Sequence, residues 1–343
     1  LEKNGFIYKT DQAIYFNISK FPSYTNLSGQ KLDEKKVGGR EDVFVDKQKR
    51  NPQDFALWFF IVGHFQDHVM RWSSPWGEGF PGWHIECSAM AMEYLGDTID
   101  IHTGGVDHIP VHHTNEIAQS EAATGKTFVK YWVHHEFLLV DGEKMSKSKK
   151  NFYRIDEISQ KALPAGRQGF DPLALRYLFL TAHYRDKINF TWKSLEAAQN
   201  ALNKLREEIR LWPASAEASD GLSDQPKGDV GQFWQKFLEA ANNDLNMPQA
   251  VAVMWEMMRS DTPISSKAKD ILEMDKILGL GLDKYLGKTI EVPENVMHLV
   301  RKREQARNTG NFKESDKLRK EIKKMGFAVE DTPSGPKIKS VVN

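Results

Sequence analysis

The sequence has little cysteine: Cys87 is the only one among its 343 residues. A single cysteine rules out an internal disulfide framework and is typical of proteins of the reducing cytoplasm, where we expect this one to lie. No run of about 18 apolar residues and no signal-peptide pattern occurs, so we expect no membrane association. Acidic and basic residues balance at 47 each. This balance excludes a global attraction to nucleic acid, and an RNA site would have to be a local patch.

Apolar residues are plentiful, at 40% of the chain, which is enough for about two or three domains. Residues 1–45 alternate short apolar runs with turn residues and predict a small β-containing segment. From residue 54 to 152 we predict strands near 98–102 and 137–140, alternating with helices at 85–95 and 112–124. Such alternation predicts a parallel sheet of the α/β class.

Beyond residue 170 the pattern becomes helical. Asp171-Pro172 is a good N-cap and first-turn pair. The helix that follows has an apolar face with members three and four residues apart, namely Leu195, Ala198, Leu202, Leu205 and Ile209. We predict a second helical group over residues 233–280. Residues 213–231 are predicted to form a linker, and residues 163–169 a loop insertion. The last segment opens with a basic run at 301–303 and ends in an extended tail.

A lysine-rich loop, Lys144-Met145-Ser146-Lys147-Ser148, follows a predicted strand and an Asp141-Gly142 turn. Two ammonium groups three residues apart, spaced by hydroxyl side chains, can close over a polyphosphate and stabilise the charge that grows as a phosphorus–oxygen bond breaks. A solvated basic turn is the simpler interpretation of the same residues. The loop alone does not decide between the two.

A possible metal pair is formed by His112 and Glu116, which are four residues apart and so share one face of a predicted helix. The alternative is an exposed histidine at a helix start with a first-turn glutamate favoured by the helix dipole. Cys87, near the start of another predicted helix, is either a ligand or an inert core thiol. Among arbitrary His-x-x-x-Glu sequences, pairs that bind no metal are commoner than metal pairs.

Three segments in order, Gly82–Met90, Asp100–Asp107 and His112–Ile117, together with the lysine loop, resemble the cysteinyl-tRNA synthetases, which are class I aminoacyl-tRNA synthetases. The resemblance extends from Tyr15-Phe16 to Glu330-Asp331-Thr332. It implies a partial Rossmann-like class I catalytic domain, followed by an all-α helical bundle and a small C-terminal anticodon-binding domain. The implied boundaries are 1–45 for part of a connective insertion, 46–160 for the catalytic domain, 161–194 for a junction, 195–285 for the bundle and 290–343 for anticodon recognition.

The resemblance implies a cysteine–tRNA ligase that uses ATP with Mg²⁺ to form cysteinyl-adenylate and transfers cysteine to tRNA(Cys), as a monomer. One zinc ion per chain would be bound by Cys87, His112 and Glu116, with His113 as a neighbour and not a ligand. Zinc would select the thiolate of cysteine over the hydroxyl of serine. The substrate cysteine would lie beside four residues, Trp83, His102, Gly104 and Asp107.

Two further sets of residues acquire roles through the resemblance. Lys144 and Lys147 would be catalytic, and ATP would be bound by these two with Met145, Ser146 and Ser148. The tRNA would contact four residues of the C-terminal segment, Arg307, Asp316, Arg319 and Asp331. Charged side chains of this kind contact phosphates and unstacked bases. The alternative for this segment is an ordinary solvated amphipathic helix.

The sequence also departs from the family pattern. The family's His-x-Gly-His motif and its first zinc cysteine are absent and the chain starts with Leu1, so we expect a truncated or split form that is inactive or impaired in forming the adenylate unaided. Lys150 stands where the family commonly has glycine, and Ile338 lies near a position usually held by tryptophan. Two other functions stay open: a ligase that joins cysteine to an amino sugar, and a non-catalytic tRNA-binding module.

Overall fold

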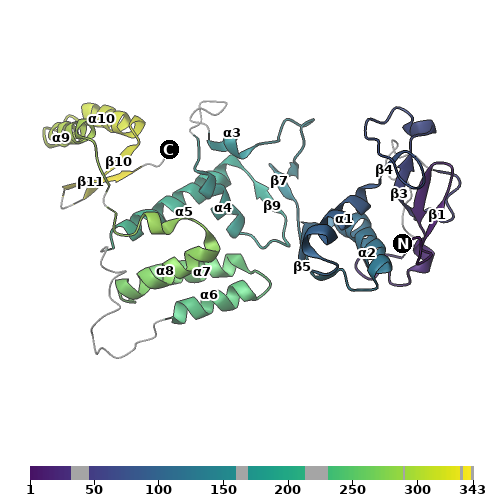
Figure 1. The fold of residues 1–343 in the computed structure, drawn as a ribbon. Coiled ribbons are helices and arrows are strands. Elements are labelled where there is room, and N and C mark those ends of the chain that lie inside the picture. The colour runs from purple at the N-terminus through teal and green to yellow at the C-terminus, as the bar shows by residue number, and fades with distance from the viewer. Residues whose placement is uncertain (32–45, 160–168, 213–230, 289, 333–334, 341–343) are drawn as a thin grey trace. The chain divides into compact units, whose positions relative to one another are not determined.

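The structure is a computed structural model that describes residues 1–31, 46–159, 169–212, 231–288, 290–332 and 335–340. The chain divides into two compact units, Leu1–Phe137 and Leu138–Asn343, whose elements are drawn in Figure 1. Among the described residues, no helix has the length and apolar character needed to cross a membrane. Apart from their last residues, the predicted linker at 213–231 and the predicted loop at 163–169 lie outside the described ranges.

The first unit begins with a four-stranded sheet in the order β1 (Ile7–Lys9), β2 (Ala13–Phe16), β3 (Phe55–Phe60) and β4 (Gly79–Pro81), with every pair antiparallel. The β-containing character of the N-terminal segment is therefore confirmed. The prediction of a parallel sheet is wrong for β3 and β4. The apolar run of β3 suits a buried strand of either direction, so its sequence could not specify the antiparallel pairing.

The parallel prediction is confirmed further along the first unit. Strands β5 (Ile99–Gly105) and β6 (Val129–His135) pair in parallel. Helix α1 (Trp83–Leu95) precedes β5, and α2 (Thr114–Thr124) lies between the strands and ends at Gly125 with a left-handed φ of 71°. The second predicted helix starts later than expected, because Ile109–His113 forms a π turn. A helical apolar period does not distinguish such a turn from an α-helix.

The second unit opens with a small sheet in the order β8 (Glu143–Lys144), β7 (Leu138–Val140) and β9 (Ile188–Phe190). The hairpin between β7 and β8 is closed by Asp141 and Gly142, both with positive φ, which confirms the predicted turn. Val140 and Phe190 belong to the same apolar core as the helices of this unit. The small sheet is thereby fixed to the helical bundle.

The bundle consists of α3 (Ile155–Ser159), α4 (Pro172–Leu180), α5 (Trp192–Arg210), α6 (Gln232–Asn242), α7 (Met247–Arg259) and α8 (Ile264–Leu278), and Figure 1 shows α6, α7 and α8 side by side. The Asp171 carboxylate accepts a hydrogen bond from the Leu173 N–H, 2.8 Å away, which confirms the predicted N-cap. All five residues of the predicted apolar face of α5 are buried. The helical half of the chain was thus predictable from periodicity.

The C-terminal segment consists of α9 (Glu294–Asn308), α10 (Phe312–Lys324) and a hairpin of β10 (Phe327–Thr332) and β11 (Gly335–Ser340). Its small core contains Val296, Val300, Ile322 and Val329. Ile338 pairs with Val329 in the hairpin and packs against this core. The predicted extended tail is therefore a strand, and Ile338 contributes to packing.

Candidate functional site

Helices α1 and α2 are fixed to each other by a buried polar contact around Ser88. The Gln119 amide donates hydrogen bonds to the Ser88 hydroxyl and to the His84 carbonyl, both at 2.6 Å, and the Ser120 hydroxyl donates to Ser88 at 2.9 Å. Serine is small enough for the two helices to approach at this point. The contact holds Cys87, the neighbour of Ser88 on α1, at the beginning of α2.

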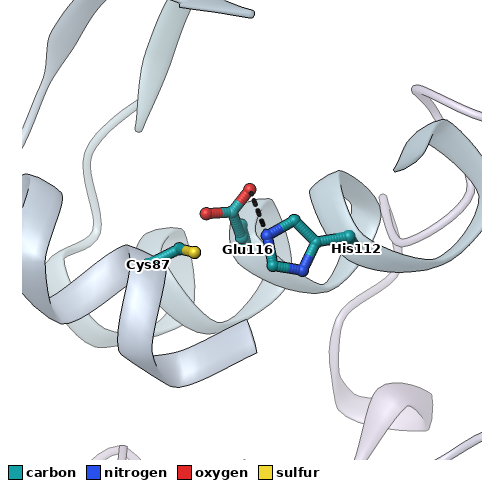
Figure 2. A group of neighbouring side chains, drawn as sticks. All are labelled: Cys87, His112 and Glu116. Atoms are coloured by element: carbon teal, nitrogen blue, oxygen red, sulfur yellow. Dashed lines mark ion pairs between the residues drawn. The ribbon is translucent and has the colours of Figure 1, made fainter. Parts of the chain in front are cut away.

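The predicted metal ligands Cys87, His112 and Glu116 come together in space. Their sulfur, nitrogen and oxygen atoms all lie within 4.8 Å of one another, and Figure 2 shows the three side chains converging. His112 is only 4% exposed, so the alternative of an exposed helix-start histidine is wrong. Glu116 is fully buried, and neither carboxylate oxygen has a hydrogen-bond partner within the described part of the chain. A buried carboxylate without such partners is costly unless a cation compensates its charge or a proton neutralises it.

The protein surroundings of these three groups favour their uncharged forms. Burial raises the pKa of Glu116 to about 8 and lowers that of His112 to about 4, with the charges of His108 and His102 adding to the second shift. The pKa of the Cys87 thiol is raised by burial and then by Glu116 and Glu86. A divalent cation favours the thiolate, the carboxylate and the neutral imidazole. This set of sulfur, nitrogen and oxygen donors fits a zinc ion.

Further histidines surround the cluster. His84 Nδ1 lies 2.9 Å from His112 Nδ1, and His134 Nε2 lies 2.8 Å from His113 Nδ1. His84 and His134 were not predicted as site residues. Their contacts join α1 and β6 to the π turn, and no spacing along the sequence signals a contact between such distant elements.

Three of the four residues predicted to lie beside the substrate cysteine are at this cluster. The Trp83 ring is 54% exposed and stacks on His112 with 4.3 Å between ring centroids. His102 Nε2 lies 3.4 Å from Glu116 Oε2. A Cβ on Gly104 would approach the His113 ring to 2.5 Å, so glycine here leaves room for that ring. Asp107 is exposed, and its carboxylate lies against Gly105.

The lysine loop is anchored at two points and exposed between them. Met145 packs against the core of the helical bundle. The Asn151 side chain accepts a hydrogen bond from the Ser146 N–H at 2.8 Å and donates one to the Lys144 carbonyl at 3.2 Å. Lys144 and Lys147 are exposed, as is Ser148, whose hydroxyl lies 3.2 Å from that of Ser146. The loop therefore presents two ammonium groups to solvent from a fixed base.

The residues predicted to contact tRNA meet partly around Asp331. Its carboxylate accepts hydrogen bonds from Arg303 at 2.7 and 2.9 Å, and Arg307 lies 3.2 Å away. Arg319 and Asp316 are exposed on α10. Arg303 was not predicted as a site residue, and its side chain is only 2% exposed. The signal that could have found it is its place after Val296 and Val300, on the same helical face.

Comparison with known proteins gives two family matches and many relatives. Residues 1–200 match the family described as tRNA synthetases class I (C) catalytic domain, and residues 289–336 match the cysteinyl-tRNA ligase anticodon binding domain. Cysteine–tRNA ligase 1 of Burkholderia lata is 42% identical over 98% of this chain and 67% of its own length. The cysteine–tRNA ligase of Caldicellulosiruptor saccharolyticus is 41% identical over 98% of this chain and 72% of its own length. That of Treponema denticola is 38% identical over 96% of this chain and 70% of its own length.

These matches agree with the order of the motifs along the chain and with the cluster of Cys87, His112 and Glu116. The first match covers more than half of the residues, and the identities extend over nearly all of them. The chain therefore belongs to the cysteinyl-tRNA synthetase family of class I aminoacyl-tRNA synthetases.

Proposed function

We propose that this chain acts as a cysteine–tRNA ligase, which activates cysteine with ATP and transfers it to tRNA(Cys). The observation that carries the proposal is the cluster of the half-buried Cys87 with the buried His112 and Glu116, found in a chain whose relatives are named cysteine–tRNA ligases. Zinc, Mg²⁺ with ATP, a monomeric state and a cytoplasmic location complete the proposal. The last of these rests on the single cysteine.

The cluster would choose the amino acid. Cys87, His112 and Glu116 would hold zinc, which when bound supplies a Lewis acid that ligates a thiolate far better than a hydroxyl. The stacked Trp83 and His112 rings and the nearby His102 would form the wall on which the substrate side chain is oriented. A pocket without such a device discriminates weakly between a thiol and a hydroxyl of nearly the same shape.

The lysine loop would serve the activation step. In that step a carboxylate oxygen of cysteine attacks the α-phosphorus of ATP, a new oxygen–phosphorus bond forms, and pyrophosphate leaves with the electrons of the bond that breaks. Lys144 and Lys147 would stabilise the charge on the phosphate oxygens, and Ser146 and Ser148 would donate hydrogen bonds to them. The Met145 and Asn151 anchors support this role, because a fixed base lowers the cost of ordering the ammonium groups.

The C-terminal segment would bind the tRNA. Arg307, Arg319, Asp316 and Asp331 offer charged and hydrogen-bonding groups on one small domain of a chain that has no net charge. The division of labour inferred from the sequence is retained in the proposal: 1–45 in a connective insertion, 46–160 catalytic, 161–194 a junction, 195–285 a bundle and 290–343 for the anticodon. The match of residues 289–336 to an anticodon-binding domain supports the last of these.

The decisive experiment measures binding of the purified chain to tRNA(Cys) and to tRNA(Ser) at two salt concentrations. We expect a preference for tRNA(Cys) on the order of tenfold or more, about 1.4 kcal/mol, that persists at the higher salt, because base contacts are less salt-sensitive than phosphate contacts. Arg319→Ala should reduce the preference. The matched control Lys276→Ala removes an exposed positive charge from α8 and should leave it unchanged. Weak binding without preference, abolished by salt, would favour the ligase that acts on an amino sugar.

A further inference from the structure

The buried carboxylate of Glu116 belongs to two sets of potential metal ligands. One is the Cys87, His112 and Glu116 set described above. The other consists of His102, His113 and Glu116, and its ligand atoms also lie within 4.8 Å of one another. The Nε2 atoms of His102, His112 and His113 lie 3.4, 3.6 and 3.9 Å from the same oxygen, Glu116 Oε2.

The two adjacent histidines are held in equivalent ways. His112 contacts His84 through Nδ1 at 2.9 Å, and His113 contacts His134 through Nδ1 at 2.8 Å. Each ring therefore directs its remaining nitrogen, Nε2, toward Glu116. Metal-binding histidines usually have their second nitrogen fixed by an outer hydrogen bond in this manner. By this criterion His113 is as well prepared to bind a metal as His112.

The carboxylate itself points to a ligand. Glu116 is fully buried, and both of its oxygens lack a hydrogen-bond partner in the described ranges, although three imidazoles surround it. If the histidines served only to hold the carboxylate in place, a hydrogen bond from at least one of them would be expected. A carboxylate has two oxygens with about four lone-pair sites, so Glu116 can take part in either ligand set.

We propose that Glu116 serves two metal positions, and that the second, formed with His102 and His113, binds a divalent cation without the Cys87 thiol. Two imidazoles and a carboxylate suit borderline cations such as Co²⁺, Ni²⁺ and Zn²⁺. The thiolate set would be preferred by softer cations. The inference goes beyond the ligase function, and its tests read the metal itself, so that failure of tRNA binding and failure of this proposal are separate outcomes.

Co²⁺ is the probe, because its absorption spectrum reports a thiolate ligand and its stoichiometry is measured by dialysis. The wild-type chain should bind Co²⁺ with a thiolate-to-cobalt band. Cys87→Ser should lose that band and still bind about one Co²⁺ per chain, more weakly by roughly 10- to 100-fold. Loss of all Co²⁺ binding from a folded Cys87→Ser variant would overturn the proposal.

Two double variants separate the neighbouring histidines. Cys87→Ser with His113→Ala should lose Co²⁺, and the matched control, Cys87→Ser with His112→Ala, should retain it. The reverse pattern would show that His113 only positions Glu116. Circular dichroism checks that each variant is folded. Because Cys87 is the only cysteine, a small thiol-capping reagent applied to the folded wild-type chain repeats the first test without a substitution, and loss of Co²⁺ there would also overturn the proposal.

Discussion

Lys150 has a backbone conformation that is unusual for its residue type. Its φ is 55°, in the left-handed region, and its N–H donates a hydrogen bond to the Lys147 carbonyl at 3.1 Å. A side chain with a Cβ costs roughly 1–2 kcal/mol in this region, whereas glycine adopts it freely. The resemblance placed glycine at this position, and the structure supplies the physical reason. The turn at Lys150, directly after the lysine loop, is therefore strained.

Replacing Lys150 with glycine should stabilise this turn. Relief of about 1–2 kcal/mol of strain is partly offset by the roughly 0.5–1 kcal/mol that glycine loses in chain entropy, so we expect a net gain of roughly 0.5–1 kcal/mol. The measurement is the urea midpoint of the second unit. Lys150→Ala is the matched control, because it removes the same charge and keeps the Cβ. Equal effects of the two substitutions would show that the turn is not strained.

At the scale of elements, α9 and β10 are joined by an ion pair between a buried arginine and an exposed aspartate. Arg303, on α9, is 2% exposed and donates two hydrogen bonds to Asp331, on β10. These hydrogen bonds, followed by the charges of Arg303, Arg307 and Arg319, lower the pKa of Asp331. Removal of the carboxylate would leave a buried guanidinium without its charged partner, which is a costly arrangement. The pair therefore stabilises the C-terminal segment.

Asp331→Asn should lower the stability of this segment by about 1 kcal/mol at neutral pH, because the Asp331 side chain is 38% exposed and solvent screens the charge of the pair. Because the folded-state pKa is lowered, the stabilising contribution is complete above the unfolded pKa of about 3.9 and is lost as the pH falls through the folded pKa. The difference in melting temperature between wild type and variant should thus be constant above about pH 5 and narrow below about pH 4. Thermal melts at a series of pH values measure it.

Asp316→Asn is the control for this prediction, because Asp316 is an exposed acidic residue on α10. Its substitution should change stability by less than about 0.5 kcal/mol. A difference between wild type and Asp331→Asn that stayed constant down to pH 3 would contradict the role assigned to the ionised carboxylate.

The elements differ in how far the sequence predicts them. Helix α5 was predictable, because a single helix buries one face. The buried residues of that face recur three or four positions apart along the sequence, as Leu195, Ala198 and Leu202 do. The direction of β3 was not, because pairing depends on a neighbour far along the chain. The candidate ligand set of Cys87, His112 and Glu116 was predicted from the family resemblance, whereas spacing alone favoured an exposed histidine. His84 and His134 complete the site through long-range contacts that leave no local pattern.

At the scale of the whole molecule, the five candidate metal ligands found among the described residues all lie in the first unit, Leu1–Phe137. A ligand stabilises the part of a protein that binds it. The stabilisation grows with the ratio of the free ligand concentration to the dissociation constant. Two compact units with separate cores need not unfold together. Metal binding is therefore a means of telling the two units apart in an unfolding experiment.

We expect zinc to raise the unfolding transition of the first unit and to leave that of the second unchanged. Free zinc at a hundred times its dissociation constant should add about 2.7 kcal/mol to the first unit, and a chelator should reverse the gain. Differential scanning calorimetry with and without zinc measures both transitions in one chain. Glu116→Gln removes the carboxylate common to both ligand sets and should abolish the zinc effect while the second transition stays in place. A zinc-dependent rise in both transitions would mean that the units unfold as one, and no rise in either would contradict a metal centre at Glu116.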